Sequence, residues 1–270
     1  PNPCQRRPGT KPPPLDPTPA SALDQEMKIS GVVITLNEEA KIEACIRSLQ
    51  KVCSEVVVLD SGSEDQTVAL CQKWGARVLH HPFEGHIQQK NRVLQEAQNP
   101  YVLSLDADEV LSDALIASIQ EATKRNQEPV AYRVRRLNNY CGQWIRYGAW
   151  NPDYKIRLWP KNRGAWGGQN PHDRVVIDSD LPVKDLAGPL LHYSYDTPEE
   201  LRIQSEKFAA ISARERRAKG SVSPSWPLLR AAFRWVRDLV FKGGFLDGKA
   251  GWIIAYENAR YTYLKYRPLP

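Results

Sequence analysis

The residues with the clearest chemical potential are two aspartates, Asp106 and Asp108, which are separated by one alanine and followed by Glu109. They come directly after the apolar run 101–105, which is typical of a buried strand. Isolated buried carboxylates are costly, whereas the carboxyl end of a parallel strand is where open α/β sheets bind ligands. Carboxylate oxygens suit Mg²⁺ or Mn²⁺, and such a metal usually also holds substrate phosphates. The motif therefore indicates a metal and phosphate site.

Two earlier predicted strands also end in polar or acidic side chains. The run 29–36 is followed by Asn37 and Glu38, and the Val-rich run 55–60 ends at Asp60. Because the carboxyl ends of parallel strands meet at one edge of a sheet, these side chains are expected to lie near the two aspartates. Three such strand ends describe a ligand site.

Helix caps offer a simpler explanation for each motif taken singly. Asn37 could cap a helix that begins there. Asp108 and Glu109 could stabilise the start of a predicted helix at 111–124 through the helix dipole. Caps alone explain three such strand ends poorly.

The elements that would position these residues alternate between strand and helix from residue 28 onward. Apolar periodicity predicts strands at 29–36, 55–60, 76–80 and 101–105, with helices at 37–51, 67–74 and 85–97. Such alternation favours a parallel sheet with right-handed crossovers.

The pattern changes after about residue 129. Strands at 130–136, 155–159 and 173–177 predict an antiparallel, substrate-facing half of the same domain. From residue 198 the chain is mainly helical, with a charged, solvated helix at 199–219 and a basic amphipathic helix at 226–241.

These patterns divide the chain into three parts. Residues 1–27 are Pro-rich and are expected to form a disordered leader. Residues 28–197 form the catalytic domain, and residues 198–270 form a helical, basic amphipathic C-terminal extension.

Composition limits the function classes. The chain has 270 residues, 41% of them hydrophobic, and a net charge of +6, which suits anionic partners. Its five cysteines have no metal-ligand spacing, which favours a reducing compartment and free thiols. The first residues lack the apolar core of a secretion signal, and we expect a cytoplasmic location. No Gly-x-Gly-x-x-Gly follows the first strand and no P-loop motif occurs, which weighs against common nucleotide-binding folds.

Four segments together resemble the family-2 glycosyltransferases of the GT-A fold, over about residues 28–195. They are Ile34-Thr-Leu-Asn-Glu-Glu39, Val58-Leu-Asp-Ser-Gly-Ser-Glu-Asp65, Gln89-Lys-Asn91 and Leu105-Asp-Ala-Asp-Glu109. The subgroup of lipopolysaccharide-core β-1,4-glucosyltransferases is similar at Gly142-Gln-Trp, at 153–159 and at 244–248. The resemblance implies an α/β, GT-A (nucleotide-diphospho-sugar transferase) fold. This fold has a mostly parallel central sheet with flanking helices, here followed by a C-terminal helical extension.

The resemblance also implies a nucleotide-diphosphate sugar donor, UDP-sugar before others. Thr35, Asn37 and Glu38 would lie along the nucleoside, and Asp60 would bond the edge of a uracil-type base. Lys90 would approach the diphosphate.

The metal implied by the resemblance is Mg²⁺ or Mn²⁺. Asp106 and Asp108 form the metal-binding Asp-x-Asp, with Asp108 as the direct ligand and Asp106 in contact with the ribose or the metal. His192 could complete the metal shell, although a lone histidine is more often a structural hydrogen-bonding residue.

An inverting transfer needs a base near the acceptor hydroxyl. The family places an acidic residue after a Gly- and aromatic-rich loop, and Asp173 follows such a loop here. Related enzymes more often have glutamate at this place, so Asp173 is a departure, and His172 is the competing base. Asp173 could instead form an ion pair with Arg174 or Arg163.

The implied function is an inverting, metal-dependent glycosyltransferase that moves a hexose, glucose by the subgroup resemblance, to a lipopolysaccharide-core or other glycan acceptor. Arg146, Lys155 and Arg157 could bind an anionic acceptor, or could be ordinary basic surface. One alternative is transfer to polyprenyl phosphate or an exopolysaccharide. The non-enzymatic alternative is a basic nucleic-acid-binding or scaffold protein, but no arginine-rich block or nucleic-acid motif supports it, and we expect no nucleic-acid partner.

The basic amphipathic helix at 226–241 also bears on location. Such a helix could lie in an anionic membrane interface, or could pack on the main domain with its arginines in water. We expect peripheral contact with the inner face of the plasma membrane and a glycan or lipid-linked acceptor there.

Overall fold

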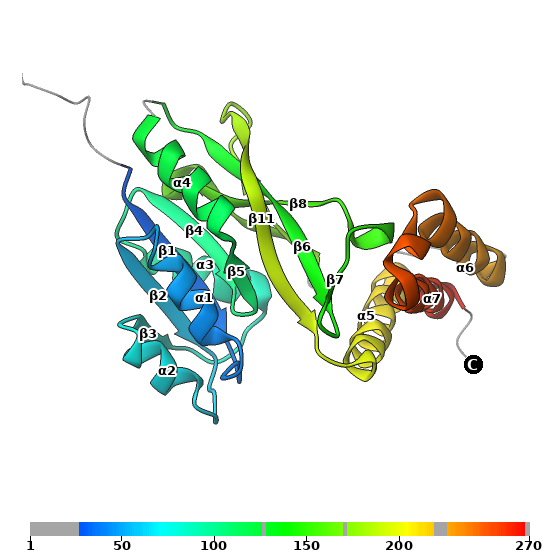
Figure 1. Ribbon diagram of the computed structural model, residues 1–270. Coiled ribbons are helices and arrows are strands. Elements are labelled where there is room, and N and C mark those ends of the chain that lie inside the picture. Colours follow the sequence, from blue (N-terminus) through cyan, green and yellow to red (C-terminus); the bar gives the residue numbers. More distant parts are fainter. Residues whose placement is uncertain (1–26, 126–127, 170–171, 219–225, 268–270) are drawn as a thin grey trace, which may run out of the picture.

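A mixed sheet of nine strands organises residues 29–195 (Figure 1). The computed structural model describes residues 27–125, 128–169, 172–218 and 226–267, so nearly all of the predicted leader at 1–27 lies outside the described residues. The strand order is β3-β2-β1-β4-β8-β6-β11-β5, with β7 paired to β6 alone. The predicted fold class, a largely parallel sheet with flanking helices and a C-terminal helical extension, is confirmed.

The first four strands of this order are parallel, as the alternating pattern predicts. They are β1 (Ile29–Thr35), β2 (Glu55–Asp60), β3 (Arg77–His80) and β4 (Tyr101–Asp106). The crossovers between them contain α1 (Ile42–Leu49), α2 (Thr67–Lys73) and α3 (His86–Glu96).

Strand register brings the polar strand ends together. Thr35 pairs with Asp60, and Ile34 pairs with Asp106. The ends of the first, second and fourth strands therefore meet at one edge of the sheet.

The second half of the sheet is less uniform than predicted. It contains β5 (Glu109–Leu111), β6 (Ala131–Tyr140), β7 (Gln143–Trp144), β8 (Asp153–Pro160) and β11 (Val183–Tyr195). Strand β8 is antiparallel to β4 and β6, but β6 and β11 are parallel, so the predicted antiparallel half is only partly correct.

The remaining elements of this half are short. Strands β9 (Gly164–Gln169) and β10 (His172–Ile177) form a separate antiparallel hairpin. Single 3-10 turns occupy Gly148–Trp150 and Lys161–Arg163.

The predicted helix at 111–124 begins later than the sequence indicates. Helix α4 spans Asp113–Arg125, and the Ser112 hydroxyl accepts the Leu115 amide. Glu109 belongs to strand β5 and is fully buried. Asp108 and Glu109 are therefore not helix caps.

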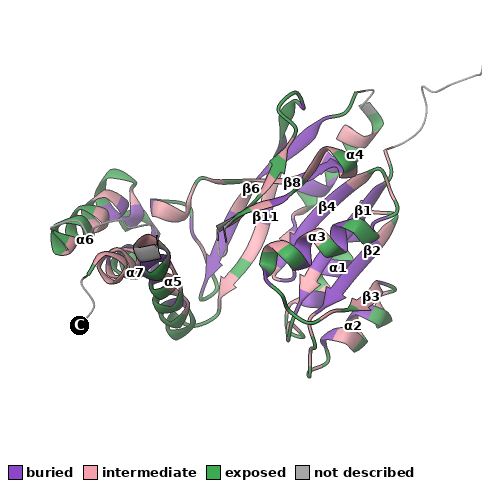
Figure 2. Ribbon diagram, turned by 180° about the vertical axis from the view of Figure 1, so that it is seen from behind, coloured by how far each residue is buried: buried purple, intermediate pink, exposed green. Residues whose placement is uncertain are grey.

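Two apolar clusters cover the two faces of the sheet, and Figure 2 shows its central strands as largely buried. Val33 faces the cluster that contains side chains of α1, α2 and α4, whereas Val32 faces the cluster formed with α3 and the β9–β10 hairpin. Successive residues of a strand point to opposite faces, which explains the near-continuous apolar runs in the sequence.

The C-terminal part is a helical layer at the end of the sheet away from β3 (Figure 1). It contains α5 (Pro198–Ala218), α6 (Pro227–Val236) and α7 (Gly248–Tyr266), with a π turn at Arg237–Phe241 and a 3-10 turn at Gly244–Asp247. Helix α7 packs against both α5 and α6. Within the described ranges, none of the helices has the length and apolar character needed to span a membrane.

Candidate active site

A cleft of about 940 Å³ lies where the strand ends meet. Its walls include Thr35 at the end of β1, Asp106 and Asp108 after β4, Asp173 of β10 and His192 of β11. Glu38 and Lys90 also line the cleft, so the structure gathers seven of the predicted site residues from elements far apart in the sequence.

Lys90 of α3 bridges two of the carboxylates. Its Nζ lies 2.7 Å from Asp106 Oδ1 and 2.7 Å from Asp173 Oδ2, and 4.1 Å from the centre of the Trp166 ring. Burial by itself lowers the pKa of Lys90, but Asp106 and Asp173 outweigh burial, so the pKa is raised and the ammonium stays charged. A fixed positive charge inside the cleft suits a diphosphate.

Asp173 points into the cleft through this contact. Neither of the ion pairs considered from the sequence forms, because Arg163 instead pairs with Asp178 and Asp180. The side chain of the competing base, His172, lies outside the described part of the chain.

A buried ion-pair network fixes Asp106 from the opposite side. Arg157 Nη2 lies 2.9 Å from Asp106 Oδ2 and 2.5 Å from Glu109 Oε1, and Arg136 Nη1 lies 3.3 Å from the same Glu109 oxygen. Burial raises the pKa of Asp106, but Lys90 and Arg157 reverse this effect and hold that pKa well below its ordinary value.

This network corrects one expectation and adds two residues. Arg157, a predicted acceptor-binding cation, is almost fully buried and lies outside the cleft lining, where it fixes the loop after β4. Glu109 and Arg136 had no assigned role in the sequence. Arg157 lies between apolar residues in the segment 153–159, and this pattern could have indicated that its side chain is buried in a strand.

Replacing Arg157 with methionine is expected to lower the free energy of unfolding by about 3 kcal/mol, because it leaves the buried Glu109 with one partner fewer. Urea unfolding followed by circular dichroism measures this change. The matched control is Asp185→Asn, which breaks the exposed pair with Arg133 and should change stability little. Equal stability of the two variants would show that the buried network is not structural.

His192 and Asp108 form the second pair in the cleft. His192 Nε2 lies 3.2 Å from Asp108 Oδ2, while His192 Nδ1 lies 2.6 Å from Asn138 Oδ1. An amide oxygen only accepts, so the contact with Asn138 calls for a proton on Nδ1, and the Ser194 hydroxyl, 2.8 Å from the same nitrogen, can accept from it as well. In the neutral ring, Nε2 therefore turns a lone pair toward a carboxylate.

This arrangement fits a divalent cation. A histidine that ligates a metal ordinarily donates its other ring N–H to an oxygen acceptor, as His192 does to Asn138. No cluster of three or more His, Cys, Asp or Glu side chains suited to a metal occurs among the described residues. Water and substrate phosphates would have to supply the remaining ligands.

Asp106 is less suited to direct ligation than Asp108. One Asp106 oxygen pairs with Lys90 and the other with Arg157. Direct ligation by Asp106 stays a prediction that these contacts disfavour.

The predicted nucleoside residues fall into two groups. Thr35 and Glu38 line the cleft, and within the described structure the buried Thr35 hydroxyl has no hydrogen-bond partner. Burial, and after it the Asp108 carboxylate, raise the pKa of Glu38 to about 7. An unpaired buried hydroxyl at a cleft wall suits contact with a ligand.

Asn37 and Asp60 hold the loops behind this wall. The Asn37 backbone has a φ of 53°, and its Oδ1 accepts the Glu64 amide at 2.9 Å. Helix α1 begins five residues later, so Asn37 is not its cap. Burial raises the pKa of Asp60, but hydrogen bonds from the Ser63 hydroxyl and from the Ser63 and Gly62 amides outweigh burial and lower that pKa. The contact of Asp60 with a base edge stays a prediction.

One wall of the cleft was missed by the sequence analysis. Side chains of α5 at helical spacing line it: Glu200, Ile203, Gln204, Lys207 and Phe208. The helix was predicted to be solvated because it is rich in charge. These residues lie at i, i+3, i+4, i+7 and i+8, a spacing that could have indicated one helix face turned toward the rest of the protein.

Comparisons with known proteins show the family of this chain. The sequence model of the family described as "Glycosyl transferase family 2" matches residues 30–177. The chain is 28% identical over 246 residues to the lipopolysaccharide core biosynthesis glycosyltransferase LpsC of Rhizobium meliloti, covering 88% of this chain and 90% of that protein. It is 31% identical over 251 residues to an uncharacterized glycosyltransferase of Rickettsia typhi, covering 88% and 85%.

Solved structures give more distant likenesses. Glucosyl-3-phosphoglycerate synthase from Mycobacterium tuberculosis, in complex with Mn²⁺ and uridine diphosphate, is 26% identical, with a TM-score of 0.35. The match covers 42% of this chain and 44% of that chain, so it spans less than half of the synthase. TarS of S. aureus is 16% identical over 86% of this chain and 55% of that chain, with a TM-score of 0.44.

Proposed function

The chain belongs to glycosyl transferase family 2 and has the GT-A fold, and from this premise we propose that it is an inverting, metal-dependent hexosyltransferase. The proposed donor is a nucleotide-diphosphate hexose, UDP-glucose first, and the proposed acceptor is a lipopolysaccharide-core glycan. The main support for this proposal is that Lys90, Asp108, Asp173 and His192 lie together in one cleft at the carboxyl ends of the strands.

On the donor side, Lys90 supplies the fixed positive charge for the diphosphate, and Thr35 and Glu38 lie along the nucleoside. Asp108 and His192 would hold a Mg²⁺ or Mn²⁺ ion. When bound, such an ion neutralises negative charge on the departing diphosphate.

On the acceptor side, Asp173 acts as the general base. The acceptor hydroxyl oxygen forms a bond to C1 of the sugar as the bond from C1 to the diphosphate oxygen breaks, and Asp173 takes the hydroxyl proton. Attack opposite to the leaving group inverts the configuration at C1.

The pairing of Asp173 with Lys90 links these two sides. An entering diphosphate competes for the same ammonium group, which now lies 2.7 Å from Asp173. Donor binding would draw Lys90 toward the phosphates and free the Asp173 carboxylate for the acceptor proton.

The position of Lys207 favours an acceptor that carries negative charge. It is exposed and lines the cleft from α5, whereas Arg146 and Lys155 do not line it. The name of the Rhizobium meliloti relative supports a core glycan. Polyprenyl phosphate or an exopolysaccharide remains the alternative acceptor. Membership of an enzyme family removes the reason to propose a nucleic-acid-binding or scaffold protein.

The donor can be tested by thermal denaturation in the presence of Mn²⁺. A ligand that binds only the native state raises the melting temperature, so UDP-glucose should raise it more than GDP-mannose does. EDTA should abolish most of the shift. If no UDP-sugar raises the melting temperature, the proposed donor class is wrong.

The acceptor requires a product assay. Purified enzyme with the best donor is incubated with truncated lipopolysaccharide core or with polyprenyl phosphate, and products are identified by mass spectrometry. We expect a mass increase of one hexose on the core glycan. Transfer to polyprenyl phosphate alone would support the alternative.

A further inference from the structure

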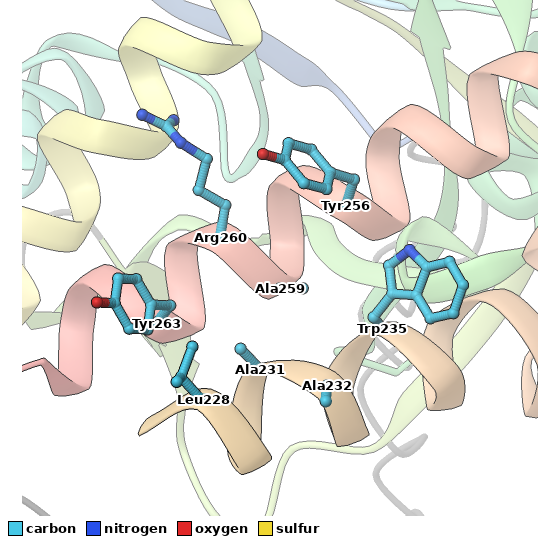
Figure 3. A pocket seen from close by; sticks show the side chains of 8 residues that line it. All are labelled: Leu228, Ala231, Ala232, Trp235, Tyr256, Ala259, Arg260 and Tyr263. Atoms are coloured by element: carbon cyan, nitrogen blue, oxygen red, sulfur yellow. The ribbon is translucent and has the colours of Figure 1, made fainter. Parts of the chain in front are cut away.

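Helix α6 has apolar side chains on two sides, none of them buried, and one of these sides faces α7. Figure 3 shows the first face, where Leu228, Ala232 and Trp235 lie across a groove of about 460 Å³ from Tyr256 and Tyr263 of α7. A helix in water ordinarily has polar residues on its remaining surface.

The second face of α6 is also apolar and lies in solvent. Leu229, Phe233, Val236 and Val240 follow at intervals of four, three and four residues, and each is between 37% and 63% exposed. Figure 2 shows α6 as largely exposed. This stripe continues through the π turn, beyond the last residue of α6.

Neighbouring elements extend the stripe into a broad surface. Large exposed apolar side chains follow in the two turns and in α7: Phe241, Phe245, Leu246, Trp252 and Tyr256. Together with Trp226 and the α6 stripe they form what we term the apolar basic surface. Exposed apolar side chains gathered on neighbouring elements are typical of contact sites for partners or membranes.

The exposed charges within 226–257 have one sign, and the nearby carboxylate of Glu206 in α5 is paired with Arg260. The acidic residues within 226–257 are Asp238, Asp247 and Glu257, and all three are buried. Among the described residues, no carboxylate forms an ion pair with the exposed Arg230, Lys242 or Lys249.

The buried acidic residues form contacts inside the protein. Asp238 pairs with Arg234 at 2.6 Å and with Arg237 at 2.8 Å, and Asp247 accepts the backbone amides of Arg146 and Tyr147. The acidic side chains fix the helical layer to itself and to the catalytic domain. The exposed charged side chains of the segment 226–257 are therefore all positive.

We propose that the apolar basic surface binds the interface of a membrane rich in anionic lipid. Apolar side chains, interfacial tryptophan and tyrosine, and unpaired cations together match the chemistry of that interface. Helix α5 carries one wall of the cleft and packs on α7, so membrane contact through this layer brings the cleft to the membrane surface. A lipid-anchored acceptor would there meet the cleft.

Co-sedimentation with vesicles tests this proposal independently of sugar transfer. The full chain should bind vesicles of phosphatidylcholine mixed with phosphatidylglycerol about tenfold more tightly than vesicles of phosphatidylcholine alone. The double variant Leu229→Glu/Phe233→Glu should lose binding to both. Because both side chains are exposed, the melting temperature should stay close to that of the unmodified chain.

Two further variants separate the causes. Arg230→Glu/Lys242→Glu/Lys249→Glu should remove the preference for anionic vesicles. The matched control is Val183→Glu, which introduces the same side chain at an exposed apolar residue at the start of β11 and should bind normally.

Two outcomes would overturn the proposal. One is equal vesicle binding by the Leu229→Glu/Phe233→Glu variant and the unmodified chain. The other is absence of vesicle binding together with a dimer in light scattering that the same variant converts to monomer, because the surface would then bind a second copy of this chain.

Discussion

Replacing Asp173 with asparagine is expected to lower kcat by a factor of about 10² to 10⁴, the usual contribution of a general base. The amide has nearly the same shape as the carboxylate and can still accept from Lys90, which keeps its second partner Asp106. Donor affinity should therefore stay close to normal. Initial rates of UDP release at saturating donor and acceptor measure the effect.

The matched control for this variant lies in the same hairpin region. Asp178→Asn makes the same chemical change at an exposed carboxylate that pairs with Arg163 outside the cleft, and it should leave kcat unchanged. If Asp173→Asn keeps full kcat, another group takes the proton, and His172→Gln would be the next variant to measure.

Replacing Asp108 with alanine is expected to lower kcat/KM by about a thousandfold, because the cation that offsets diphosphate charge contributes several kcal/mol to the transition state. The structural reason is that Asp108 Oδ2 and His192 Nε2 lie 3.2 Å apart, where one cation could bind both, whereas Asp106 is engaged by two cations. The same variant should lose Mn²⁺ binding in calorimetric titrations performed with UDP present.

The titration separates a metal ligand from a residue that only shapes the loop. Asp113→Ala removes an exposed carboxylate at the start of α4 and should bind Mn²⁺ normally. Undiminished, metal-dependent turnover by Asp108→Ala would show that the metal is held elsewhere.

Local pattern was enough to predict most of the sheet's parallel half. Strand β2 has the predicted bounds, and β1, β3 and β4 differ from theirs by one residue. Each of these strands is a short Val-, Ile- or Leu-rich run, and both faces are covered by helices or by the hairpin. The strand propensity of these residues and their burial on both faces therefore favour the same structure.

Local sequence pattern did not predict the structure of segments whose conformation depends on long-range contacts. Asp108 and Glu109 could have stabilised the start of a helix at 111–124, but residues 109–111 form strand β5, and the Glu109 carboxylate accepts from Arg157, 48 residues later. The parallel pairing of β6 with β11 joins segments about fifty residues apart. Nothing within either segment specifies such a partner.

The sequence by itself determined the chemistry of the strand ends. Asp106, Asp108 and Asp173 are read directly from the chain, and their motifs indicate a family whose members share the order of these segments. Strand periodicity then places the carboxyl ends of parallel strands at one edge, because parallel strands run in the same direction.

Only the tertiary structure decided which partner each charged group has. It placed Lys90 between two carboxylates, buried Arg157 beneath Asp106, and turned one face of α5 into the cleft. The interaction of two charges depends on their distance and burial, and neither is a property of a local segment.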